Sequence, residues 1–114
     1  MTRKQKQELD LLLRELVFQR DNHHCRKCGS TQRLAPSHIY PKGKYTRLRW
    51  EPDNVLTLCY RCHIEWWHKN PLEAAEWLKT ILRPETLEHL KIATQIVDKS
   101  PIDYHAIRLM LENK

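Results

Sequence analysis

Four cysteines stand in two closely spaced pairs, and their spacing is the clearest sign of chemistry in this sequence. The pairs are Cys25-x-x-Cys28 and Cys59-x-x-Cys62. A gap of two residues lets both thiolates of a tight turn point at one ion, and two such turns complete a tetrahedral shell that suits zinc. Two disulfides or a redox pair are the alternatives, and disulfides are rare in a reducing cytosol. We therefore expect a structural Zn²⁺ ion that stabilises a small core.

Two histidines and an asparagine lie between the cysteine pairs or directly after them. His38 lies in a short stretch between prolines, Asn54 follows a Pro-Asp pair, and His63 follows Cys62. A neutral imidazole can take a proton from water near pH 7, and it can also bind a divalent ion. Each residue also has a structural alternative. His38 could be a packed strand histidine, Asn54 a turn residue and His63 a replacement zinc ligand, although four cysteines already fill a tetrahedral site.

The order of these residues resembles that of the HNH nucleases. In many members of this family a ββα-metal motif, also called a His-Me finger, sits inside a four-cysteine zinc frame. The resemblance covers roughly residues 25–71 and is carried most specifically by residues 53–63, which read DNVLTLCYRCH. Residues 66–71 and the helical tail are similar to small nucleases of phage and prophage origin.

This resemblance implies a metal-dependent endonuclease that hydrolyses phosphodiester bonds in DNA. His38, on the first strand, would be the general base that activates water. Asn54 would orient that imidazole through a hydrogen bond. His63, at the start of a helix, would bind the catalytic ion that stabilises the phosphate and the leaving oxygen. Mg²⁺ or Mn²⁺ is the expected ion, with Ni²⁺ or Zn²⁺ as further candidates.

The sequence departs from the family pattern directly before His38. Many HNH enzymes have Asp, Glu or His there as a further metal ligand, whereas this chain has Ser37, whose hydroxyl is a weak ligand. A second helix ligand commonly follows the first by four residues, which here is Trp67, with His68 one step beyond. Five residues of α-helix turn a side chain by about 140°, so joint binding by His63 and His68 requires a distorted turn or a shifted helix start. His68 is therefore a candidate ligand, and a DNA-facing or solvent-exposed histidine is the alternative.

A basic loop separates the two predicted strands and is the candidate DNA-binding segment. Its cations are Lys42, Lys44, Arg47 and Arg49. Arg47 and Arg49 alternate as on one side of a strand, where they could neutralise phosphates without reading bases. The whole chain has 20 Lys and Arg against 14 Asp and Glu, a net charge of +6 that suits a polyanionic partner. A plain solvated hairpin is the alternative.

The spacing of apolar residues predicts the elements that position these side chains. An amphipathic helix is expected over residues 4–19, with an apolar face made of Leu9, Leu12, Leu13, Leu16 and Val17. Short strands are expected at 37–40 and 55–58, and a helix is expected to begin at 64–68 and to end before Pro71.

From Pro71 onward the chain is expected to be helical. One apolar stripe joins Leu72, Ala75, Leu78 and Leu82, and a second joins Leu87, Leu90, Ala93 or Thr94 and Val97. The last helix is expected to begin at Ser100-Pro101, with the serine as its cap. From that helix, Tyr104, Ile107 and Leu111 are expected to face inward.

Together these features predict a mainly helical α+β fold: a ββα-metal core with a four-cysteine zinc site, flanked by an N-terminal helix and C-terminal helices. A chain of 114 residues suits one domain, divided into a helix at 1–24, the core at 25–70 and a helical extension at 71–114 that closes over the site. We find no run of about eighteen apolar residues and no signal-peptide core. We expect a cytoplasmic protein with no membrane partner, in the host cytoplasm if it is phage-encoded, that acts on DNA as a monomer or weak dimer.

Two other function classes stay open at this point. A non-catalytic, zinc-stabilised DNA-binding or packaging accessory module would have lost its catalytic metal through Ser37. A zinc-stabilised protein-interaction domain would leave the basic loop unexplained. The joint presence of His38, Asn54 and His63 favours the nuclease, because a pure binding module has no common need for all three.

Overall fold

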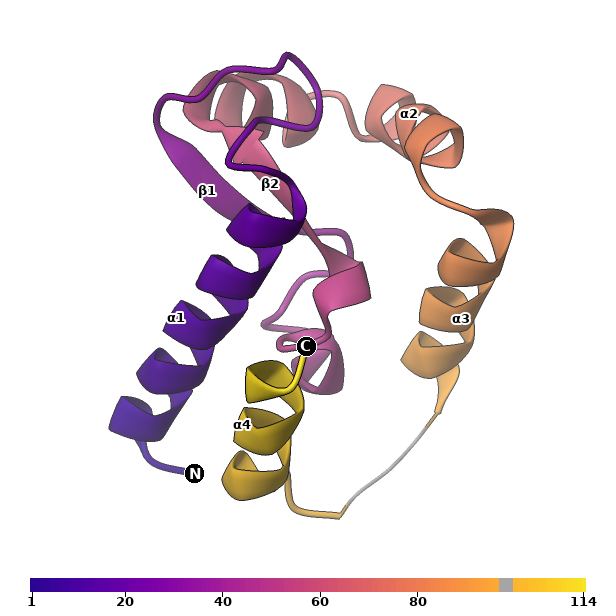
Figure 1. Ribbon diagram of the computed structural model, residues 1–114. Helices are drawn as coiled ribbons and strands as arrows, with labels where there is room; N and C mark the ends of the chain where they lie inside the picture. Colours follow the sequence, from indigo (N-terminus) through magenta and orange to yellow (C-terminus); the bar gives the residue numbers. More distant parts are fainter. Residues whose placement is uncertain (97–99) are drawn as a thin grey trace.

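A two-stranded hairpin stands at the centre of the molecule, with helices on both sides of it (Figure 1). In this computed structural model, which describes residues 1–96 and 100–114, β1 (Leu34–His38) pairs antiparallel with β2 (Val55–Cys59). The register sets Leu34 opposite Cys59 and His38 opposite Val55. Both predicted strands form, but β1 begins and ends earlier than its expected bounds of 37–40. The backbone N–H of Ile39 still donates to the carbonyl of Asn54, the residue opposite it in the same register, so the pairing extends just past β1.

The N-terminal helix α1 (Arg3–Arg20) forms as predicted. Thr2 caps it through a reciprocal pair of hydrogen bonds with Gln5, which satisfies two backbone N–H groups of the first turn. Its apolar face buries Leu9, Leu13 and Val17 completely or nearly so. These residues belong to a core cluster with Trp50, Val55, Tyr104 and Leu111. Helix α1 therefore packs against the loop between the strands, against β2 and against the last helix.

Asp21, at the end of α1, is buried and accepts hydrogen bonds from three segments of the chain, a role that no sequence pattern predicted. Its side chain is 2% exposed and accepts hydrogen bonds from the guanidinium groups of Arg20 and Arg26. It also accepts one from the backbone N–H of Thr57 in β2, at 3.0 Å. Burial alone would raise the pKa of Asp21, but hydrogen bonds from Arg20 and Thr57 hold it below its usual value. One carboxylate thus joins α1, β2 and the first cysteine turn.

The helix after the second cysteine pair is a π-helix, η3 (Arg61–Trp67), and it begins earlier than expected. It ends before Pro71, as predicted. A proline is the first residue of both α2 (Pro71–Ile81) and α3 (Pro84–Gln95). At that position the backbone N–H has no partner within the helix, so the missing N–H of proline costs no hydrogen bond. The predicted stripe on α2 is correct at Leu78, which is buried, but wrong at Leu72, which is 85% exposed, and at Ala75, which is exposed; Ala74 is buried instead. On α3, Leu90 is buried as predicted, and Val97 lies outside the described residues.

The last helix, α4 (Tyr104–Glu112), begins later than predicted. Its cap is Asp103, whose carboxylate accepts from the N–H groups of His105 and Ala106, so the prediction of Ser100 as the cap is wrong. Tyr104 and Leu111 are buried and Ile107 packs against the same core, as predicted.

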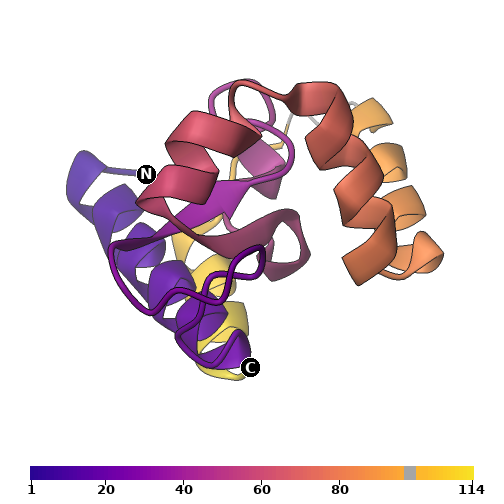
Figure 2. The same ribbon diagram turned by 90° about the horizontal axis from the view of Figure 1, so that it is seen from above.

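The helices lie on two sides of the hairpin and do not form one C-terminal bundle. Helix α4 lies beside α1 (Figure 1), and the view from above places α2 and α3 on the opposite side (Figure 2). Contacts follow the same division: α4 packs on α1, whereas α2 meets η3 and α3 meets the turn η2 (Pro52–Asn54). The predicted single helical extension closing over the site is therefore wrong.

No helix within residues 1–96 or 100–114 has the length and apolar character needed to cross a lipid bilayer.

We expect Asp21→Ala to lower the free energy of unfolding by about 2–4 kcal/mol, because it leaves the buried N–H of Thr57 without its acceptor and removes the ionic partner of Arg20 and Arg26. Thermal or urea unfolding measures the loss. A matched control is Glu76→Ala, which breaks an ion pair to Lys79 whose side chains are 64% and 74% exposed, so its effect should stay within about 0.5 kcal/mol. Equal effects for the two variants would contradict the conclusion that Asp21 joins α1, β2 and the first cysteine turn.

Candidate functional site

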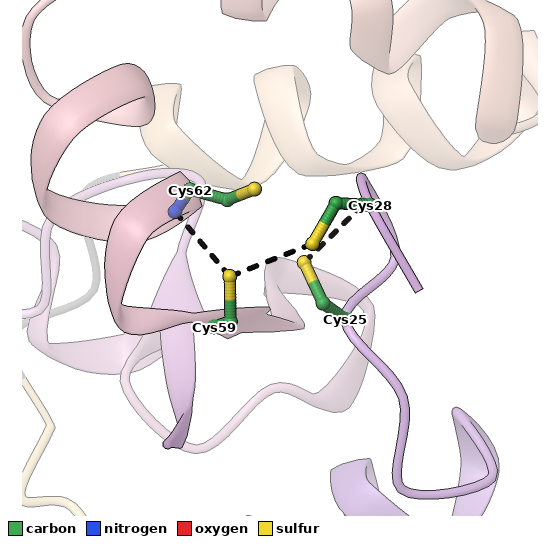
Figure 3. A group of neighbouring side chains, drawn as sticks. All are labelled: Cys25, Cys28, Cys59 and Cys62. Carbon is green, nitrogen blue, oxygen red and sulfur yellow. Dashed lines mark hydrogen bonds between the residues drawn. The ribbon is translucent and has the colours of Figure 1, made fainter. Parts of the chain in front are cut away.

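The four cysteine sulfurs converge on one point (Figure 3). Their Sγ atoms all lie within 4.8 Å of one another, and all four thiols are free. Sulfurs around one tetrahedral zinc ion lie about 3.8 Å apart, given Zn–S bonds of about 2.3 Å. The 3.6 Å between the sulfurs of Cys28 and Cys59 is close to that spacing and far too long for a disulfide. The cluster is compatible with a structural zinc ion.

The two cysteine turns have the same local geometry. The N–H of Cys28 points at the sulfur of Cys25, and the N–H of Cys62 points at the sulfur of Cys59, both at 3.5 Å. Gly29 closes the first turn with a φ of +81°, which favours glycine. Burial alone would raise the pKa of Cys25, but backbone N–H donors lower it to about 7. The pKa values of Cys28 and Cys62 are instead raised, so without an ion the cluster favours a thiolate at Cys25 and not at those two residues.

Tryptophans cover the cysteine cluster. Trp67 and Trp77 pack against it together with Leu34, and the rings of Trp67 and Trp77 meet edge to face at 6.4 Å. The neighbouring Trp66 joins the same aromatic group: its ring centre lies 5.3 Å from that of Trp77, and the Lys27 ammonium of the first cysteine turn lies 4.9 Å from it. Of the two adjacent tryptophans, Trp67 is the one that packs against the cysteines.

Beside this cluster, three histidines line one cavity of about 500 Å³. They are the sequence candidates His38 from β1, His63 from η3, and His68 directly after η3. Asp10 of α1 and Lys42 of the basic loop line the same cavity. The fold therefore brings together all three predicted histidines, from segments separated by the whole basic loop.

His63 and His68 face each other because η3 is a π-helix. The N–H of His68 donates to the carbonyl of His63 at 3.2 Å, an i to i+5 bond that stacks residues five apart. Their Nε2 atoms lie 3.1 Å apart and their ring centres 4.6 Å apart. Metal–imidazole bonds of about 2.0–2.1 Å put adjacent ligand nitrogens roughly 3 Å apart, so one ion can join this pair. The distorted turn that joint binding requires is thus present.

His63 is half-buried, and its environment favours the form that binds metals. Burial, followed by the nearby imidazoles of His68 and His38, lowers its pKa below the ordinary histidine value. A neutral imidazole keeps a lone pair for an ion, whereas a protonated one does not.

His38 is held by the backbone of the basic loop. Its Nε2 lies 2.9 Å from the carbonyl oxygen of Arg49. A carbonyl only accepts, so Nε2 carries the proton and the lone pair of the neutral ring is on Nδ1. Burial, together with the positive charge of Lys42, lowers the pKa of His38. The imidazole is therefore neutral near pH 7 and able to accept a proton.

Asn54 does not orient His38, contrary to the prediction. The side chain is completely buried. Its Oδ1 accepts from the N–H of Tyr40 at 2.9 Å, and its Nδ2 donates to the carbonyls of Tyr40 and Leu48, both at 3.0 Å. The amide thus ties together the two ends of the loop between the strands. The orienting contact to His38 comes from Arg49, a backbone role that residue type does not reveal.

Ser37 stands apart from the histidine cavity. It is completely buried, and within the described part of the chain its hydroxyl has no hydrogen-bond partner. Its neighbours Pro36 and His38 line the cavity, but Ser37 is not among the described lining residues. Ser37 is therefore not placed to bind an ion in this cavity.

Of the four predicted DNA-binding cations, two are engaged within the protein. Arg47 lies in the 3₁₀ turn η1 (Thr46–Leu48) and donates to the carbonyl of Ser100. Arg49 forms an ion pair with Asp10 at 2.7 Å. The expectation that these two arginines project from one side of a strand is wrong, because the loop turns there. Lys42 and Lys44 are exposed, and Lys42 reaches the histidine cavity.

Asp10 is the cavity residue that sequence reasoning missed. It lies beside the core residue Leu9 on α1, and 39 positions separate it from Arg49. No local spacing marks such a contact.

Comparisons of the chain with protein-family models, curated proteins and solved structures found no match.

We expect the folded chain to bind one Zn²⁺ ion through its four thiols and to lose fixed tertiary structure when a strong chelator removes it. The physical reason is that the ion joins the two cysteine turns, and structural zinc contributes about 10–16 kcal/mol in small modules. Near-UV circular dichroism and a zinc assay would measure this, with Co²⁺ substitution reporting thiolate ligation. Zn²⁺ should restore the spectrum and Mg²⁺ should not. A zinc-free chain that keeps its spectrum and melting temperature would contradict the expectation.

Proposed function

We propose that this chain is a metal-dependent DNA endonuclease built on a ββα-metal core, with a structural zinc ion in the cysteine cluster. One observation carries the proposal: a neutral histidine and a pair of histidines able to share one ion line the same cavity, which also holds a lysine. The order of strand, strand and helix, with His38 on the first strand and His63 on the helix, agrees with the HNH pattern.

In this proposal His38 is the general base. Its Nδ1 takes one proton from water as the water oxygen bonds to phosphorus, the bond from phosphorus to the 3′ oxygen breaks, and that oxygen takes a proton from solvent. The lowered pKa of His38 suits the role, because burial keeps the ring unprotonated near pH 7. The Arg49 carbonyl keeps the other ring nitrogen occupied.

His63 and His68 hold the catalytic ion. Their facing Nε2 atoms would offer two neutral nitrogen ligands to such an ion. When bound, a divalent ion such as Mg²⁺ or Mn²⁺ supplies Lewis-acid stabilisation of the phosphate and of the leaving oxygen. Lys42, exposed at the same cavity, and Lys44 attract and position the DNA backbone.

A second candidate function is a non-catalytic DNA-binding module. The buried Ser37 favours it, since a position that binds metal in many HNH enzymes here contributes nothing to the cavity. Such a module would bind DNA in a salt-sensitive manner and cut none of it.

Cleavage of supercoiled plasmid tests the two candidates directly. We expect the zinc-loaded protein to nick or linearise plasmid with Mg²⁺ or Mn²⁺ and not with EDTA. His38→Ala should lower the rate by at least about 100-fold, because it removes the base. The control His89→Ala replaces an exposed histidine of α3 and should leave the rate unchanged. Salt-sensitive binding without cleavage in any metal would overturn the nuclease and favour the binding module.

The role of His68 has its own measurement. We expect His68→Ala to weaken Mn²⁺ binding by roughly 10–100-fold or more, since even the loss of an outer-shell partner has an effect of that size. Mn²⁺ suits the titration because it prefers nitrogen and oxygen ligands to thiolates. The control His105→Ala, on α4, should not change the affinity. Unchanged Mn²⁺ affinity in folded His68→Ala would remove His68 from the ligand set.

A further inference from the structure

The carbonyl that holds His38 belongs to a loop that two separate sets of hydrogen bonds hold in place. Asn54 clamps one part through Tyr40 and Leu48, as described above. The residues that follow Leu48 are clamped by α1. The Arg49 carbonyl lies at the junction of the two clamps, and it accepts a hydrogen bond from Nε2 of the His38 ring.

Asp10 makes the second clamp with three hydrogen bonds. Its Oδ1 accepts from Arg49 Nε at 3.1 Å and from Trp50 Nε1 at 2.9 Å, and its Oδ2 accepts from Arg49 Nη2 at 2.7 Å. Burial alone would raise the pKa of Asp10, but the bonds from Arg49 and Trp50 hold it below its usual value. The carboxylate is therefore ionised near pH 7 and grips two consecutive residues.

The clamp is rigid because Trp50 is part of the core. Trp50 is 4% exposed and packs with Leu9 and Leu13 of α1. The Arg49 guanidinium also lies 5.1 Å from the Trp50 ring centre. With both side chains fixed to one carboxylate, the peptide that carries the Arg49 carbonyl has little freedom to rotate.

We propose that Asp10 is a positioning residue: through Arg49 and Trp50 it fixes the carbonyl that holds His38 with its proton on Nε2 and its lone pair on Nδ1. This inference rests on the proposed function only for its catalytic consequence, since the ring geometry exists without it. A free histidine interconverts between its two neutral forms, so a general base gains from a partner that selects one of them. Asp10 does this from another helix without touching the imidazole.

A purely stabilising ion pair is the alternative explanation, because the Arg49 and Asp10 side chains are partly buried, at 21% and 35% exposed. What distinguishes this pair is its consequence for the Arg49 backbone. A stabilising role alone would leave the protonation of the His38 ring unchanged.

The experiment reads the protonation of the His38 ring by nitrogen NMR in the zinc-loaded protein. The chemical shifts of the ring nitrogens separate the two neutral forms, and His38→Gln identifies the signals. We expect the wild type to be mainly protonated on Nε2, Asp10→Ala to contain a mixture, and Asp10→Asn to lie between them. In plasmid cleavage we expect kcat of Asp10→Ala to fall by roughly 10–100-fold, with KM changed less than about twofold.

Glu8→Ala is the matched control. Glu8 is on the same helix, and its carboxylate accepts from the hydroxyl of Tyr104 on α4, away from the basic loop. A wild-type His38 signal in folded Asp10→Ala and Asp10→Asn would overturn the inference. An equal shift in Glu8→Ala would also overturn it, because general loosening would then be the cause. If wild-type protein cuts no DNA but the Asp10 variants alone change the His38 ring, the nuclease proposal fails and the positioning inference stands.

Discussion

The convergence of four cysteine sulfurs within 4.8 Å of one another is the geometric constraint on which the other contacts in this small fold depend. The first pair follows α1, while Cys59 ends β2 and Cys62 lies in η3. Holding these turns together brings the end of the N-terminal helix, the end of the hairpin and the start of η3 to one place. Thiolates so close would repel one another, and a bound cation would offset that repulsion. The Asp21 carboxylate reinforces the junction by joining α1 to β2.

The same condition accounts for the π-helix. Cys62 anchors the start of η3, and Trp67 must reach the cysteine cluster, against which it packs. In an α-helix the residue four positions after His63, which is Trp67, would stack beside the imidazole. The i to i+5 geometry places His68 there instead and leaves Trp67 to cover the cluster. Unusual helix geometry at functional sites is a recurrent feature of π-helices, and here the same distortion lets Trp67 pack on the cysteines and His63 face His68.

Local pattern was enough to predict the cysteine turns, the amphipathic face of α1 and the two strands, since each depends on residue types a few positions apart. It failed where contacts between residues far apart in the sequence determine burial, helix caps or hydrogen-bond partners. Leu72 fits an apolar stripe, but α2 rotates so that Ala74 and Leu78 are buried. Asp103 caps α4 because its carboxylate reaches two amides of the first turn, a competition that the Ser-Pro signal does not reveal. The partners of Arg49 and His38 lie 39 and 11 positions away, beyond any periodicity.

In the candidate site, the type of a residue does not reveal whether the fold places it near the His38 imidazole. Asn54 belongs to the motif that carries the HNH resemblance, and its amide has all of its contacts with the loop backbone. Asp10 lies outside that motif, and it holds the residue whose carbonyl bonds to the imidazole. The protonation of His38 is therefore a property of how α1 docks on the loop. Any change that shifts α1 relative to β2, even one far from the cavity, should reach the imidazole through Asp10 and Arg49.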